Sequence, residues 1–133
     1  MSSLQDLRLK PSAKSPQVDF SADSGVLEIS GKSIPENSHK LYEPLLAWLD
    51  EYTRQPAATT ELHFKLSYFN SSSAEYILEM MRKLESIHLR GKPVRALWFY
   101  EEDDEDMQLI GEDFQAMLKL PLSLVLIAPK EEY

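Results

Sequence analysis

The segment TTELHFKLSYF, residues 59–69, alternates between apolar and polar side chains and constrains the fold more than any other stretch of the chain. Alternation of this kind predicts a β-strand, because successive side chains of a strand point to opposite faces of the sheet. Four apolar side chains share one face of this strand: Leu62, Phe64, Leu66 and Tyr68. His63, Lys65 and Ser67 share the other face, so we expect one side of the sheet to be buried and the other to be wetter.

Helical periodicity occurs once before this strand and twice after it, so that helices alternate with strands along this part of the chain. The predicted strands are residues 7–10, 18–21, 26–30, 59–69, 93–102 and 123–128. The predicted helices are a segment that is capped at Asn37 or Ser38 and ends before Pro56, then residues 72–89 and residues 105–120. Strands separated by helices imply right-handed crossovers. We therefore expect an α/β fold with a mixed, mostly parallel sheet and helices mainly on one face.

Packing can be predicted at a few positions of this pattern. Gly111 stands in the middle of the third predicted helix, where glycine costs about 1 kcal/mol relative to alanine. We therefore expect that helix to pack closely against its neighbours at this point. Leu41 and Met117 are expected on the inner faces of the first and third helices, and Trp98 is expected in the core.

Composition restricts the classes of function. The 133 residues suit one domain over residues 1–133, with a start at residues 1–16 that we expect to be loosely held. The absence of cysteine excludes disulfides and thiol nucleophiles, and it suits a cytoplasmic protein. A formal net charge of −8 disfavours binding to nucleic acid or to an anionic membrane. We expect no membrane span, because no apolar run approaches the roughly 18–20 residues that a span needs.

The acidic run EEDDED, Glu101 to Asp106, has two interpretations. It could hold a hard cation, since Ca²⁺ and Mg²⁺ prefer oxygen ligands, but it lacks the spaced ligands and the central glycine of a Ca²⁺ loop. It could also be a solvated loop whose last acids begin the third helix, where negative charge is favourable. We favour the second interpretation, and we expect neither a metal nor a cofactor.

Three serines, Ser71 to Ser73, stand between the central strand and the second helix. Ser72 and Glu75 have the spacing of a capping box, in which Ser72 would be the N-cap. One cap needs one serine, so this interpretation leaves two hydroxyls unexplained. A helix N-terminus at the carboxyl end of a strand tolerates a phosphate, because free N–H groups and the helix dipole favour negative charge there. One of these serines is therefore a candidate phosphoacceptor.

Four segments of the chain resemble the SiaC family of bacterial regulatory phosphoproteins. They are GKSIPENSHKLYEPLLAWLDEY, LSYFNSSSAEYILEMMRKLE, GKPVRALWFYEEDDEDMQLIGEDF and LPLSLVLI, which occur in this order. The resemblance as a whole covers about residues 25–127. The PEN and YFNSSS blocks are the most specific parts. The family is similar in fold to the SpoIIAA-type anti-sigma-factor antagonists, the STAS fold, and this implies a STAS-like domain here.

The resemblance implies a non-enzymatic switch. Family members are phosphorylated on the hydroxyl residue after the asparagine of the N-[ST]-S-S block, which is Ser71 in this chain, with Ser72 and Ser73 as alternates. The resemblance implies a kinase of the anti-sigma-factor type, a phosphatase of the PP2C type, and a diguanylate cyclase that the unphosphorylated form activates. Cyclic di-GMP signalling and biofilm formation would be the output.

We expect the partner surface to surround the acceptor. Its expected residues are Tyr68, Asn70, Ser72, Ser73, Glu36 and Asn37. Two other functions remain open at this point: a small metal-dependent hydrolase that uses the acidic run 101–106, and a structural interaction module that is never phosphorylated.

Overall fold

The computed structural model describes residues 4–127, and its strands and helices follow the order that the sequence predicts. The strands are β1 (Leu7–Leu9), β2 (Gln17–Phe20), β3 (Val26–Ser33), β4 (Thr60–Phe69), β5 (Val94–Glu101) and β6 (Leu122–Ile127). The helices are α1 (Ser38–Arg54), α2 (Ser71–Leu89) and α3 (Glu105–Met117). Ala128, the last residue of the final predicted strand, lies outside the described residues.

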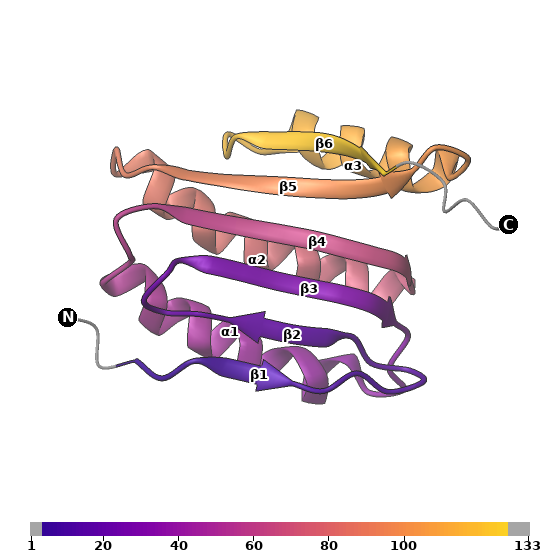
Figure 1. Ribbon diagram of the computed structural model, residues 1–133, viewed down its shortest axis with the longest axis horizontal. Helices are drawn as coiled ribbons and strands as arrows, with labels where there is room; N and C mark the ends of the chain where they lie inside the picture. Colours follow the sequence, from indigo (N-terminus) through magenta and orange to yellow (C-terminus); the bar gives the residue numbers. More distant parts are fainter. Residues whose placement is uncertain (1–3, 128–133) are drawn as a thin grey trace, which may run out of the picture.

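One sheet of six strands forms the frame of the molecule, and each strand lies beside the next one along the chain. The pairs β1–β2 and β2–β3 are antiparallel, and the pairs β3–β4, β4–β5 and β5–β6 are parallel. All three helices lie behind this sheet in Figure 1, so they cover the same face. The mixed, mostly parallel sheet with helices on one face is thus confirmed. Since β3 and β4 are parallel, α1 and α2 begin at the same edge of the sheet.

The core fills the space between the sheet and the helices, and Trp98 lies within it, as predicted. Two helical positions differ from the prediction. Tyr42 is fully buried on α1, whereas Leu41 is only partly buried at the flank of the helix. Met117 is 50% exposed, because the inner stripe of α3 runs through Gly111 and Phe114 and passes to one side of it.

Gly111 packs as closely as its position in the helix suggested. A Cβ atom at this residue would lie 2.5 Å from Cδ2 of Leu124 and 2.5 Å from Cδ1 of Trp98. Real Cβ contacts are longer than this, so any side chain at the position must displace its neighbours. The glycine therefore lets α3 approach β5 and β6 closely.

A β-bulge near the end of β4 changes which side chains face the core. Gly31 pairs with Leu66 and the next residue of β3 pairs with Tyr68, so Ser67 is an extra residue in β4. The alternation shifts by one position at such a bulge. Phe69 consequently turns inward and lies edge-to-face against Trp98, with ring centroids 6.0 Å apart. Tyr68 was expected on the buried face, but it is 57% exposed.

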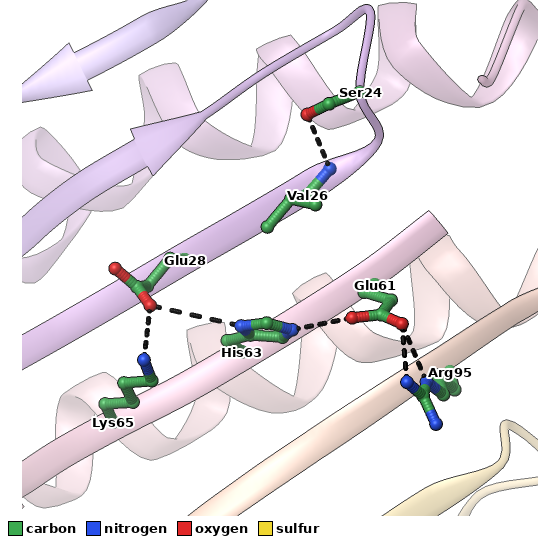
Figure 2. A network of polar contacts seen from close by, with 7 residues as sticks. All are labelled: Ser24, Val26, Glu28, Glu61, His63, Lys65 and Arg95. Carbon is green, nitrogen blue, oxygen red and sulfur yellow. Dashed lines mark hydrogen bonds and ion pairs between the residues drawn. The ribbon is translucent and has the colours of Figure 1, made fainter. Parts of the chain in front are cut away.

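The sheet face without helices carries a network of charged side chains, which Figure 2 shows. His63 stands between two carboxylates, with Nε2 at 2.9 Å from Glu61 and Nδ1 at 3.9 Å from Glu28. Glu61 also accepts from Arg95 at 2.6 Å, and Lys65 lies 2.8 Å from Glu28. This arrangement confirms that the second face of β4 is the more polar one.

Candidate functional site

The helices α1 and α2 begin beside each other, and an asparagine caps each of them. The side chain of Asn37 accepts from the backbone N–H of Lys40, and that of Asn70 accepts from the backbone N–H of Ser73. Asn70 has an extended backbone conformation, as an N-cap requires. The prediction that Ser72 is the N-cap is therefore wrong, because Asn70 occupies that role and the helix begins at Ser71.

A chain of hydrogen bonds extends from the partly buried cap of α2 into the buried core. Oδ1 of Asn70 lies 2.6 Å from Oγ of Ser73, which lies 3.0 Å from Oγ of Ser33. Oγ of Ser33 in turn lies 2.5 Å from the phenolic oxygen of Tyr42. An amide oxygen can only accept, so a consistent set of protons has each hydroxyl donating toward Asn70.

Tyr42 supplies the far end of this chain of hydrogen bonds. Burial raises the pKa of its phenol above the ordinary value, although the hydrogen bonds to Ser33 and Ser73 act in the opposite direction. The phenol consequently keeps its proton at neutral pH and remains a donor. Together these contacts lock Ser73 in place, and its side chain is fully buried.

Ser72 is held differently, at the junction of the two helices. Its Oγ lies 2.5 Å from Oγ of Ser38, the first residue of α1, and 3.2 Å from Oδ1 of Asn70. The hydroxyl thus bridges the starts of α1 and α2, although the residue as a whole is exposed.

Ser71 is the first residue of α2 and is exposed. Within residues 4–127 its hydroxyl makes no side-chain hydrogen bond, unlike those of Ser72 and Ser73. Of the three serines, Ser71 is therefore the one whose hydroxyl reaches solvent without first breaking a contact.

The PEN block lies beside the serines, as the fold brings the two loops together. Nδ2 of Asn70 donates to the backbone oxygen of Pro35 at 3.4 Å. Glu36 is exposed and forms an ion pair with Lys14 at 2.6 Å. The hydrogen bond from Lys14 and its positive charge lower the pKa of Glu36. Five of the six residues predicted for the partner surface, all except Tyr68, thus gather around the paired helix starts.

Tyr68 faces another feature, a hollow of about 370 Å³ between the end of β4 and the helix α3. Its lining residues are Ser67, Tyr68, Phe69, Asp104, Asp106, Met107, Leu109, Ile110 and Asp113. Phe69, which lines the hollow, is separated from Ser71 by one residue, so the hollow and the three serines are adjacent along the chain.

Comparison with known proteins identifies the family. The model of the SiaC family of regulatory phosphoproteins matches residues 9–127, which is most of the chain. The chain belongs to this family. The resemblance carried by the PEN and YFNSSS blocks is thereby confirmed.

Proteins similar to this chain are found in Pseudomonas aeruginosa. An uncharacterised protein of strain UCBPP-PA14 is 26% identical over 121 residues, which covers 91% of this chain and 96% of that protein. The structure of apo-SiaC is 27% identical with a TM-score of 0.82, over 94% of this chain and 99% of that one. SiaC in its crystal structure with the diguanylate cyclase SiaD, where SiaC is the activator, is 26% identical with a TM-score of 0.86, over 92% of this chain and all of that one.

The acidic run has a structural role in this SiaC-family chain. Asp104 is the N-cap of α3 and accepts from the backbone N–H of Met107 at 3.0 Å, while Glu105 and Asp106 lie in the first turn. This is the arrangement expected for acids that stabilise a helix start. In residues 4–127 no group of three or more His, Asp or Glu side chains is placed to hold a metal ion. No helix in that range is long and apolar enough to cross a membrane.

Sequence reasoning missed three polar residues of the site: Ser33, Ser38 and Tyr42. All three had a signal in the pattern. Ser33 lies an even number of residues after the buried Leu27 and Ile29 on β3, so the alternation of the strand places its side chain on the same inward face. Ser38 and Tyr42 lie one helical turn apart on the stripe that continues through Leu45. Their contacts with α2 had no signal, because these depend on how the two helices are placed.

Proposed function

We propose that this protein is a phosphorylation-controlled regulator that acts by binding a partner protein and has no enzymatic activity of its own. Membership of a family of regulatory phosphoproteins supports the control by phosphate. The complex of the related SiaC with SiaD supports a diguanylate cyclase as the partner, because this chain and the SiaC of that complex match over almost their full lengths. The proposed output is cyclic di-GMP signalling, which promotes aggregation or biofilm formation.

Ser71 is the proposed acceptor, and the state of its hydroxyl is the observation that carries this assignment. Ser73 is fully buried and holds the cap of α2, so a kinase would have to unfold the helix start to reach it. Ser72 is bound to Ser38 and Asn70. Ser71 alone of the three is exposed with a side chain that makes no hydrogen bond in the described part of the chain.

The modifying enzymes in this proposal are a kinase of the anti-sigma-factor type and a PP2C-type phosphatase. The Ser71 oxygen would attack the γ-phosphorus of ATP, ADP would leave, and a base of the kinase would take the hydroxyl proton. Hydrolysis by the phosphatase would return the free serine and inorganic phosphate. We place this cycle in the cytoplasm, where the nucleotide substrates of both the kinase and the cyclase are available.

The test is intact-mass and phosphopeptide analysis of the wild type and of Ser71→Ala and Ser72→Ala, each isolated from the native cell. We expect one phosphate on Ser71 in the wild type, none in Ser71→Ala, and an unchanged phosphate in Ser72→Ala. A full phosphate on Ser71→Ala would move the acceptor to Ser72 or Ser73. Absence of phosphate in every sample and growth condition would refute the phosphorylation switch.

A second measurement tests the partner. The unphosphorylated protein should bind a diguanylate cyclase encoded in the same cell and raise its rate of cyclic di-GMP synthesis. Protein phosphorylated on Ser71 should bind it more weakly. Binding that is equal in the two forms would remove the switch, even if the phosphate is present.

A further inference from the structure

The hollow between β4 and α3 combines apolar side chains with unneutralised acids. Tyr68 and Leu109 are among the large apolar side chains that are more than half exposed, at 57% and 58%, and both line this hollow. Met107 forms part of its floor and is 5% exposed. Two of the exposed large apolar side chains are therefore brought together in one concave place, beside the acids described next.

The charges around the hollow have one sign. Asp104, Asp106 and Asp113 line it, and no lining residue is a cation. Within residues 4–127 neither Asp106 nor Asp113 has an ion-pair partner.

Helix stability accounts for only part of this charge. Asp106 lies in the first turn of α3, where the helix dipole favours an acid. Asp113 lies near the other end of this helix, where an acid has no such advantage. Asp106 and Asp113 are seven residues apart, so they lie on the same face of the helix as Ile110, toward the hollow.

We propose that this hollow is a docking site for a segment of a partner protein that carries apolar side chains beside lysines or arginines. The apolar side chains of the segment would enter between Tyr68 and Leu109. Its cations would meet Asp106 and Asp113. A volume of about 370 Å³ suits a few side chains of a peptide segment, and the acids supply the charge complementarity that selects a basic one.

The site also responds to phosphate at Ser71, and this part of the inference rests on the proposed function. Phe69 lines the hollow, and its Cα atom is at most about 7.6 Å from that of Ser71 along the chain. This separation is within the Debye length of roughly 8 Å at physiological ionic strength. A phosphoserine adds a charge of about −1.5 to −2. A basic segment in the hollow is therefore attracted more strongly after phosphorylation, whereas the cyclase is released. The segment belongs to a partner that engages the phosphorylated form.

The experiment uses the full chain and a synthetic amphipathic helical peptide with leucines on one face and lysines on the other. Calorimetry gives the affinity, and backbone amide NMR shifts give the location. We expect saturable binding with shifts centred on Tyr68, Leu109 and Ile110. Asp106→Asn combined with Asp113→Asn should weaken binding about tenfold, and Leu109→Ser should weaken it several-fold.

Matched controls separate docking from general attraction to an acidic protein. Leu89→Ser removes an equally exposed leucine, 62% exposed, from the far end of α2. Asp23→Asn with Glu79→Gln removes two exposed acids elsewhere. Both control variants should bind the peptide as the wild type does, and a peptide with glutamates in place of lysines should not bind. Equal losses in test and control variants, or shifts spread over the whole surface, would overturn the proposal.

The coupling of the hollow to phosphate at Ser71 is tested with Ser71→Glu, which adds a single negative charge. We expect this variant to bind the lysine peptide about twofold more tightly at low salt, with the difference shrinking as salt is added. Weaker binding by Ser71→Glu would refute the coupling. Failure of Ser71 to be phosphorylated in cells would defeat the proposed function but would leave the result with the unmodified protein, so the two failures are distinguishable.

Discussion

The side-chain oxygen of Asn70 accepts two hydrogen bonds from Ser73, one from its backbone N–H at 3.0 Å and one from its hydroxyl at 2.6 Å. This pair ties the start of α2 to the buried hydroxyls of Ser33 and Tyr42. The acceptor candidate Ser71 therefore projects from a turn that is fixed on the inside. A phosphate can be added to such a turn without disturbing the contacts that hold it.

Asn70→Ala should lower the free energy of unfolding by about 1–3 kcal/mol. The substitution removes an N-cap, which costs about 0.5–2 kcal/mol, and leaves the buried hydroxyl of Ser73 with a poorer acceptor. Chemical denaturation measures the change. Ser72→Ala is the control and should cost less, since Ser72 is not the cap. Equal costs for the two variants would contradict the assignment of the cap to Asn70.

Phosphorylation of Ser71 should block a surface and leave the fold unchanged. At a helix N-terminus the added charge gains about 0.3–1 kcal/mol, whereas burying it against a partner without a counter-charge costs about 2–5 kcal/mol. We expect amide NMR shifts confined to the starts of α1 and α2 and to the end of β4. Affinity for the cyclase should fall at least about 30-fold. Shifts through all three helices would indicate remodelling instead.

Gly111→Ala should destabilise the protein although alanine is the better helix former. The gain in helix propensity is about 1 kcal/mol, but the new methyl group would meet Trp98 and Leu124 at 2.5 Å. Trp98 is 1% exposed and donates from its indole to the backbone oxygen of Met107 at 2.9 Å, so its ring has little freedom to move. Overpacking costs about 1–3 kcal/mol. A thermal unfolding midpoint above that of the wild type would show that α3 moves freely.

The stability of the protein should fall on acidification in part through Glu61. Its pKa is lowered by the hydrogen bond with His63 and by the hydrogen bond and charge of Arg95. A lowered pKa in the folded state means that the stabilisation is present above the unfolded pKa of about 4.3 and is lost as pH falls through the folded value. Denaturation at a series of pH values should show a shallower acid decline for Glu61→Gln. An identical decline would show that the network of Figure 2 does not contribute.

The order of strands and helices could be predicted from the sequence because it depends on local patterns. The alternation around Phe64 and the helical spacing of Leu45 and Leu49 indicate which side chains are buried. These patterns depend only on residues that are close together in the sequence. The start of α1 followed from its capping residues for the same reason, whereas the cap of α2 was wrongly assigned to Ser72. Asn37 was correctly named as a cap candidate, and its hydrogen bond is made within its own turn.

The site depended on relations that no local pattern contains. The bulge at Ser67 arises from the register of β4 against β3, and it exposes Tyr68, which the alternation had placed inside. The contact of Ser38 with Ser72 spans 34 residues and exists only because parallel strands bring two helix starts to one edge. Sequence therefore determined which residues are apolar and which bear a hydroxyl. Tertiary structure alone decided which hydroxyl is left free, because hydrogen bonds between distant segments form only after the sheet has fixed their separation.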